Sequence, residues 1–283
     1  MHIPVLQKEV IKYLDPKPNE NFIDCTFGQG GHSSAILEKN APNGKILGID
    51  LCLTLKVKHP RVVLVQDNFA NLAEIVRQYK FKKVKGILLD LGYSSWHLEE
   101  SKRGFSFQKK ESLDMRYNLQ NQLTAEKIVN FWSKFEIERI FREYGEERFA
   151  QNIAEQIIKE RKSKTIETTN HLVEIIASAV PRGYSRQRIH FATRVFQALR
   201  IAVNDELNNI EKVLPQALQV LEPGGKLAVI SFHSLEDRIV KDFFKNNIAK
   251  INLLTKKPIV PTRQEIIINN RSRSAKLRAA IKI

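Results

Sequence analysis

Between residues 21 and 33, an apolar run passes directly into a glycine-rich turn and then into a helical pattern. The run Asn21 to Phe27 predicts a buried strand, Gly28-Gln29-Gly30-Gly31 predicts a turn, and a helix is expected from about His32 to Lys39. Glycines let the backbone approach a ligand closely, and a helix that starts there offers free N–H groups. Ser33 occupies the place of the third glycine of a dinucleotide fingerprint. The junction favours a nucleotide-like ligand over a merely tight turn.

Similar apolar runs recur along the chain and predict the fold class. Strands are expected at 45–50, 62–66 and 84–91, with a helix at 72–79, and their continuous apolar character is typical of a parallel sheet buried on both faces. Residues 123–179 and 192–221 show helical spacing, and the turn at 222–225 precedes a fifth strand at 226–232. We therefore expect a doubly wound α/β domain that is interrupted after its fourth strand by a helical insertion.

Composition excludes several classes of protein. The 283 residues suggest two domains, or one large domain with an insertion. No run of about 18 apolar residues is present, so a membrane-spanning helix is not expected. Only Cys25 and Cys52 occur, without a CxxC pair, and the seven histidines lack metal-ligand spacing. We expect a cytoplasmic protein without a disulfide framework or a metal requirement.

The charge is strongly positive and unevenly spread. Lys and Arg number 46 against 31 Asp and Glu, a net charge of +15. From Arg238 to the end there are twelve cations and two acids, about +10. A polyanionic partner, either nucleic acid or an anionic membrane, would explain this excess, and a passive solvated tail is the alternative. Because apolar residues interleave with the cations, we favour contact with nucleic acid.

Polar or aromatic residues stand where three predicted strands end, at the edge of the sheet where ligands bind. Asp50 follows the second strand about twenty residues after the glycines, where a carboxylate accepts hydrogen bonds from ribose; a solvated loop acid is the alternative. Phe69 follows the third strand, and its ring could face an adenine or pack in the core. Asp90 ends the fourth strand and could accept an N–H of an amine substrate or hold the amino-acid end of a cofactor.

These segments together resemble the bacterial ribosomal RNA small subunit methyltransferase H family, also called MraW. The resemblance runs through nearly the whole chain, and its most specific strings are Phe232-His233-Ser234-Leu235-Glu236-Asp237-Arg238 and Arg271-Ser272-Arg273-Ser274-Ala275-Lys276-Leu277-Arg278. The chain departs from the family pattern at His97, where the family has Gln, and at Tyr117, where it has Met. The segments after Asp50 and Lys245 are shorter than in the family.

The resemblance implies a Rossmann-like class I methyltransferase that uses S-adenosylmethionine to methylate N4 of a cytidine in the decoding region of small-subunit (16S) rRNA. The methyltransferase domain would comprise residues 1–104 and 190–283, and the substrate-recognition domain would be the helical insertion, 105–189. By matching position, the implied cofactor contacts are Gly30, Gly31, His32, Asp50, Phe69, Asp90 and His97.

The expected partner is the rRNA of the 30S particle, with no membrane and no obligate protein partner. The cations expected to contact RNA are Arg194, Arg200, Arg271, Arg273, Lys276 and Arg278. Two other functions stay open at this point. One is an amine methyltransferase for another nucleic acid, and the other is a non-catalytic RNA-binding protein that binds S-adenosylmethionine.

Overall fold

The structure is a computed structural model that describes residues 3–53, 59–93, 95–181, 183–184 and 189–283. Contacts within the chain form two compact units, one of residues 1–92 with 207–283 and the other of residues 93–206. Each unit has a hydrophobic core of its own and is described by itself below.

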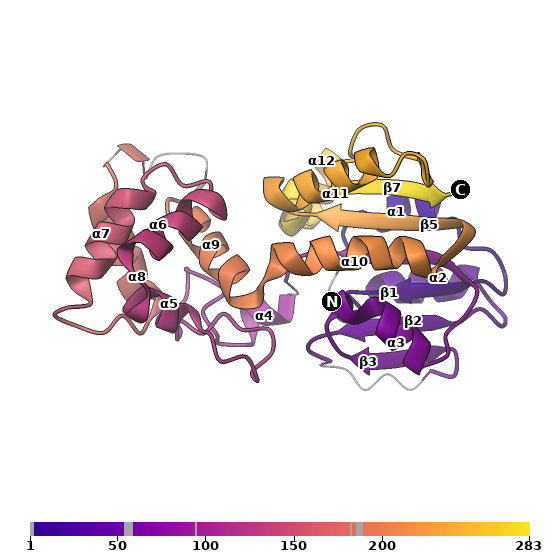
Figure 1. Ribbon diagram of the computed structural model, residues 1–283, viewed down its shortest axis with the longest axis horizontal. Coiled ribbons are helices and arrows are strands. Elements are labelled where there is room, and N and C mark those ends of the chain that lie inside the picture. Colours follow the sequence, from indigo (N-terminus) through magenta and orange to yellow (C-terminus); the bar gives the residue numbers. More distant parts are fainter. Residues whose placement is uncertain (1–2, 54–58, 94, 182, 185–188) are drawn as a thin grey trace. The chain divides into compact units, whose positions relative to one another are not determined.

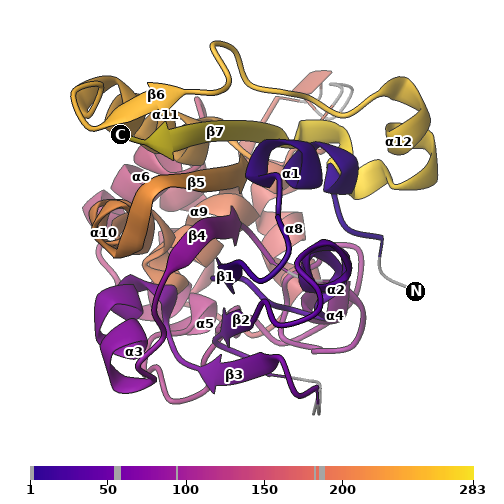
Figure 2. The ribbon, with the colours of Figure 1, turned by 90° about the vertical axis from the view of Figure 1, so that its right-hand side faces the viewer.

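A seven-stranded sheet forms the centre of the first unit, in the order β3-β2-β1-β4-β5-β7-β6 (Figures 1 and 2). Its strands are β1 (Asn21–Asp24), β2 (Ile46–Asp50), β3 (Val62–Gln66), β4 (Val84–Asp90), β5 (Leu221–Ser231), β6 (Ile251–Leu253) and β7 (Lys276–Lys282). The first five strands are parallel, and β7 lies antiparallel between β5 and β6. The predicted α/β class is confirmed, and β1, β2 and β4 end at the same edge of the sheet.

Helices cover both faces of this sheet (Figure 2). They are α1 (Gln7–Leu14), α2 (Gly31–Lys39), α3 (Leu72–Gln78), α10 (Glu206–Val220), α11 (Ser234–Asn246) and α12 (Arg263–Ile268), with short 3₁₀ turns at Phe69–Asn71 and Asn270–Ser274. On one face, Ile75, Leu214 and Phe244 of α3, α10 and α11 pack against strand residues such as Ile49. On the other face, α1 and α2 bury residues such as Val10. The continuous apolar runs follow from this two-sided burial.

Three of the five predicted strands and the predicted helices at 32–39 and 72–79 lie where the sequence places them, and the limits of the other two strands need correction. The first strand ends at Asp24 instead of Phe27, because the backbone turns there toward Gly28. The turn expected at 222–225 is part of β5, which runs from Leu221 with a register shift against β4. The strands β6 and β7 and the helix α1 were not predicted.

The second unit is helical, as the spacing over 123–179 predicts. Its helices are α4 (Ser95–Glu99), α5 (Ala125–Phe131), α6 (Lys134–Glu143), α7 (Ala150–Glu160), α8 (Thr169–Ala179) and α9 (Thr193–Asn204). Ile137, Ile140 and Phe141 of α6 are fully or almost fully buried in its core, as their spacing indicates. Ser133 caps α6 through a capping box with Glu136, which satisfies N–H groups at the start of that helix.

The limits of the two units differ from the predicted domain limits of 104 and 190. Leu98, before the predicted insertion, packs against the helical core, and Arg103 donates a 3.1 Å hydrogen bond to the carbonyl of Arg116. On the other side, Leu199 and Val203 of α9 are buried in the same core. The segments on both sides of the predicted insertion therefore pack with the helices.

None of the helices in the described parts of the chain combines the length and the apolar character that crossing a membrane requires.

Candidate active site

The glycine-rich turn joins β1 to α2 and leaves no room for a side chain at Gly30 or Gly31. Gly28 and Gly30 have φ values of +52° and +75°, which disfavour other residues. A Cβ on Gly30 would lie 2.8 Å from the ring of Phe27, and one on Gly31 would lie 2.4 Å from Cγ of Pro4. The helix α2 begins at Gly31, so its first N–H groups face this turn without intrahelical partners.

Asp50 is held against the same turn from the end of β2. Its Oδ2 accepts a 2.8 Å hydrogen bond from the N–H of Gly28, and its Oδ1 accepts a 2.9 Å bond from the N–H of Cys52. Burial raises the pKa of Asp50, while these backbone donors lower it, and burial prevails. A carboxylate has more acceptor sites than these two bonds use, so Asp50 can still accept from ligand hydroxyls.

His32 and Asp90 form a buried pair beside the turn. His32 is the second residue of α2, and its Nε2 lies 3.5 Å from Oδ2 of Asp90 at the end of β4. Their side chains are 7% and 18% exposed. Burial lowers the pKa of His32, but the carboxylates of Asp90 and Asp24 outweigh it, so that the pKa is raised above its ordinary value.

Three further residues support this pair and were not predicted to have a role. Ser33 donates a 2.7 Å hydrogen bond to Oδ2 of Asp24, and Oδ1 of Asp24 accepts from the N–H of Thr26 at 3.2 Å. The hydroxyl oxygen of Thr26 in turn accepts a 2.7 Å bond from the N–H of Asp90. The position of Asp24 and Thr26 at the end of β1 was the available signal, but their partners come from other strands and helices.

The other two predicted cofactor contacts lie in different surroundings. Phe69 begins a 3₁₀ turn after β3 and is partly buried against the core of the first unit. His97 belongs to the second unit, where its ring lies 5.1 Å from Phe105 and 5.0 Å from Tyr117, measured between centroids. Burial, with the charges of Arg103 and Arg200, lowers the pKa of His97 to about 4. The structure thus brings together Gly30, Gly31, His32, Asp50 and Asp90 in the first unit, and His97 is a neutral histidine among aromatic rings in the second.

The six cations expected to contact RNA divide into two groups. Arg271 and Arg273 are exposed on the 3₁₀ turn before β7. Arg194, Lys276 and Arg278 donate hydrogen bonds, the first to the carbonyl of Glu146 and the other two to the carboxylate of Asp237.

Arg200 requires a correction. It makes two hydrogen bonds of 2.9 and 3.0 Å to the carboxylate of Glu206 and lies over the ring of Tyr93. Its side chain is only 11% exposed. Its guanidinium is therefore engaged inside the helical unit instead of being presented to phosphate.

Comparison with known proteins decides the family. The family model described as the MraW methylase family matches residues 1–283. The chain belongs to the MraW methylase family. This MraW methylase is 45% identical to a protein of Heliobacterium modesticaldum, covering 100% of this chain and 98% of that one. It is 47% identical to a protein of Thermosipho melanesiensis, again covering 100% and 98%. Both relatives are named Ribosomal RNA small subunit methyltransferase H.

The Heliobacterium relative also bears on length. Its alignment spans 308 positions, whereas this MraW methylase has 283 residues, so that relative has residues without a counterpart here. The segment after Asp50, which we expect to be short, falls partly outside the described residues, because 54–58 are not described.

Like its family, this chain is a Rossmann-like class I methyltransferase, and S-adenosylmethionine is its methyl donor. The residues of the first unit fit that cofactor. Among the described residues, both ring nitrogens of His32 and the Oδ1 of Asp90 are buried without a hydrogen-bond partner. Buried polar atoms of this kind are costly unless a ligand satisfies them. At Gly30 the turn presents backbone atoms, and no side chain, to the same region.

Proposed function

We propose that this methylase modifies N4 of a cytidine in the decoding region of small-subunit (16S) rRNA. The names of its relatives support ribosomal RNA as the substrate. The observation that carries the choice of an exocyclic amine is the buried Asp90, whose Oδ1 has no partner among the described residues. An amine conjugated with a base needs an acceptor for its N–H, because this acceptor localises the lone pair on nitrogen. The expected cytoplasmic location follows from the substrate.

Different residues of the first unit would bind different parts of the cofactor. Bound S-adenosylmethionine supplies a methyl group on a sulfonium, a leaving group that requires no covalent intermediate with the enzyme. Asp50 would accept hydrogen bonds from the ribose hydroxyls, and Phe69 would lie along the adenine. Gly30 and Gly31 would let the backbone approach the cofactor closely.

Asp90 and His32 would act at the amine. When N4 gains a methyl group it must lose one proton. Oδ1 of Asp90 would accept a hydrogen bond from the N–H group that carries this proton. His32, 3.5 Å from Oδ2, would fix the orientation of the carboxylate. Asp24, through Thr26, would hold the backbone of Asp90 in place. Most of the rate enhancement would come from alignment of the amine with the methyl group.

The substrate base must also leave its stack to reach the site, because N4 is not accessible to an enzyme inside a duplex. We propose that the helical insertion, 105–189, is the substrate-recognition domain. The exposed Arg271 and Arg273 would contact phosphates. A 30S particle is the proposed substrate, and no obligate protein partner is proposed.

The test is transfer of tritium from labelled cofactor to 30S particles from a strain that lacks the family's enzyme, followed by mapping of the modified nucleotide. We expect one labelled cytidine in the decoding region. Equal labelling of generic DNA, or a label on a different base, would overturn the proposal in favour of another nucleic-acid amine.

Variants at Asp90 and Asp50 separate chemistry from cofactor binding. Asp90→Asn should lower kcat by about a hundredfold or more while calorimetry shows cofactor binding within about threefold of wild type. Asp50→Ala should abolish detectable cofactor binding, and the exposed Asp242→Ala serves as the matched control. If Asp90→Asn loses cofactor binding in proportion to activity, Asp90 is a cofactor ligand and not the amine acceptor.

A further inference from the structure

Two phenylalanines of the helical unit stand almost fully in solvent. Phe131 ends α5 and is 77% exposed, and Phe135 is the second residue of α6 and is 75% exposed. They are four positions apart in the sequence, so their Cα atoms are at most about 14 Å apart. Trp132 between them is half-buried and packs against the helical core. Along the chain, the two exposed rings therefore lie on either side of Trp132, which the core holds in place.

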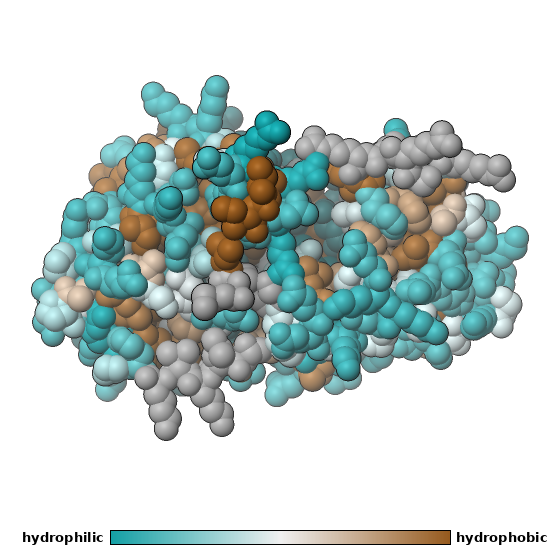
Figure 3. Space-filling view, turned by 180° about the vertical axis from the view of Figure 1, so that it is seen from behind, coloured by the Kyte–Doolittle hydropathy of each residue, from teal (hydrophilic) through white to brown (hydrophobic). Residues whose placement is uncertain are grey.

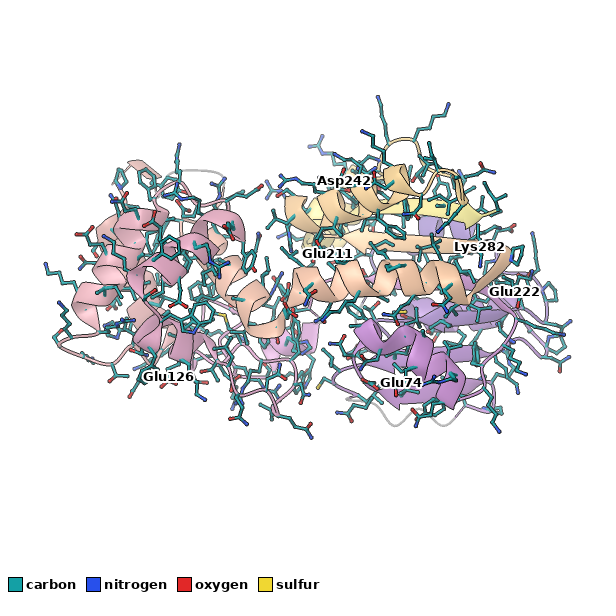
Figure 4. All side chains as sticks on the ribbon, in the orientation of Figure 1. Glu74, Glu126, Glu211, Glu222, Asp242 and Lys282 are labelled. Carbon is teal, nitrogen blue, oxygen red and sulfur yellow. The ribbon has the colours of Figure 1, made fainter. Side chains whose placement is uncertain are left out.

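Local packing does not require aromatic residues at these places. The helix α5 buries Ala125, Ile128 and Val129, and its other end carries the half-buried Glu126, labelled in Figure 4. In α6 the buried positions begin at Ile137. An aromatic side chain buries roughly 150–250 Å² when it packs. A single exposed apolar residue is ordinary, but two such rings at one helix junction mark an interaction surface.

A basic loop, residues 161–166, is hydrogen-bonded to the chain segment around Phe131. Arg161 donates hydrogen bonds of 3.0 and 2.7 Å to the carbonyls of Val129 and Trp132. Five residues later, Ile166 and the amide of Asn130 exchange two hydrogen bonds of 3.0 and 2.9 Å. The loop 161–166 is thus attached at both ends to the last turn of α5, next to Phe131.

The residues between these attachment points are exposed and cationic. Lys162, Ser163 and Lys164 lie in solvent, and the loop contains no acidic residue. Glu155 pairs with Lys134 at 3.2 Å, and Glu136 accepts from the N–H of Ser133 at 2.9 Å. Glu160 and Glu167 flank the loop, and Glu160 lies 3.3 Å from His171. Within the loop itself the exposed charges are positive.

Exposed rings beside lysines match the chemistry of unpaired RNA. Bases stack on aromatic side chains whatever their sequence, and phosphates are attracted to cations. An apolar pocket of a protein would cover the rings but would not require the lysines. We propose that Phe131 and Phe135 form a stacking surface for unpaired RNA bases, with Lys162 and Lys164 contacting the adjoining phosphates. This inference rests on the proposed RNA substrate and adds a contact region to it.

The experiment compares two probes on the full chain by fluorescence anisotropy. One is a short single-stranded RNA with a fluorescein label, and the other is the same backbone without bases. Phe131→Leu and Phe135→Leu should each weaken binding of the base-bearing probe by at least about fivefold. Phe131→Tyr and Phe135→Tyr should stay within about twofold of wild type, because they keep the ring. None of these four changes should alter binding of the abasic probe.

Variants of Lys162 and Lys164 test the proposed contacts with phosphates. Lys162→Ser and Lys164→Ser should weaken binding of both probes and reduce the salt dependence, whereas Lys39→Ser on α2 is the matched control. All variants should keep wild-type melting temperatures and affinity for S-adenosylhomocysteine, because the changed side chains are exposed.

Two outcomes would overturn the proposal. One is wild-type affinity of both Leu variants for the base-bearing probe. The other is equal weakening by Leu and Tyr, which would indicate an apolar contact with a protein. The assay needs no catalysis, so its failure is distinct from that of the proposed function: methylated 30S particles with unaffected Leu variants would refute only the stacking surface.

Discussion

His97 shows how strongly one position depends on its surroundings. Its side chain is 7% exposed and lies among Trp96, Phe105 and Tyr117. A ring in such a place is neutral at pH 7, because burial and two nearby arginines lower its pKa to about 4. From the sequence we expected this residue to contact the cofactor; in the structure it belongs to the packing of the helical unit.

Stability should therefore fall as the pH drops from about 6.5 to about 4. In that window the unfolded chain protonates His97 and the folded chain does not, so acid favours unfolding by up to about 3 kcal/mol. Urea unfolding at pH 7 and pH 5 should show this loss in wild type and a smaller loss in His97→Gln, whose side chain does not titrate. The same pH dependence in both proteins would contradict the assignment.

For single residues, the sequence predicted those locations that follow directly from the order of strands and turns along the chain. Asp50 and Asp90 stand at the ends of β2 and β4, Gly30 immediately precedes α2 in the turn after β1, and parallel strands end at one edge. The bond from Asp90 to Thr26 crosses 64 residues, and the pairing of Arg200 with Glu206 depends on how α9 ends. Such partners follow from tertiary packing, which no local pattern contains.

Among the elements, the last strand, β7, is attached by side-chain hydrogen bonds to α11. Arg278 of β7 donates to both carboxylate oxygens of Asp237 on α11, at 2.6 and 3.2 Å, and Lys276 donates to the same group at 3.4 Å. Asp237 and Arg278 are 13% and 11% exposed. These two cations, which we expect to contact RNA, also attach β7 to α11.

Asp237→Asn should lower the free energy of unfolding by roughly 2 kcal/mol, because it leaves a mostly buried guanidinium without its carboxylate. Asp242 lies on the same helix in solvent (Figure 4), 3.7 Å from Lys241, and Asp242→Asn should change stability by less than about 0.5 kcal/mol. Urea denaturation measures both. Equal effects would show that the bonds to Arg278 contribute little.

The two strands that escaped prediction share one property. The strands β6 and β7 lie at the antiparallel edge of the sheet, within a segment so rich in Lys and Arg that its apolar positions are hard to see in sequence. Inner strands such as β4 are apolar throughout because both faces are covered. Local pattern predicts an element well where burial is complete and poorly where one face carries charge.

For the whole molecule, the excess of positive charge lies on folded structure and not on a tail. The last 46 residues form α11, β6, α12 and β7 after Arg238 begins the basic segment. The exposed cations of that segment are Arg238, Lys241, Lys245, Lys250, Lys256, Lys257, Arg263, Arg271 and Arg273. The view in Figure 3 shows mostly hydrophilic surface with smaller hydrophobic patches. Ordered cations of this kind suit a polyanionic partner.

The helical unit should fold when it is cut out of the chain, because its core is its own. A fragment of residues 93–206 should show helical circular dichroism and cooperative thermal unfolding. Phe141→Ala should destabilise the fragment by about 3–5 kcal/mol, since Phe141 is fully buried, while Phe131→Ala should leave its melting temperature nearly unchanged. A fragment without cooperative unfolding would contradict this prediction.

The insertion also bears on how quickly the sheet can form. The neighbouring strands β4 and β5 pair although one ends at Asp90 and the other starts at Leu221. Such a long separation would make their encounter slow in an unstructured chain. Within the helical unit, 93–206, however, Asn204 donates a 2.7 Å hydrogen bond to the carbonyl of Met115, and the N–H of Tyr117 donates to Asn204 at 2.8 Å. Once the helices have folded, the early and late parts of the insertion are tied together and the effective loop shortens. Early collapse of the helical unit would then set the rate at which the catalytic edge is assembled.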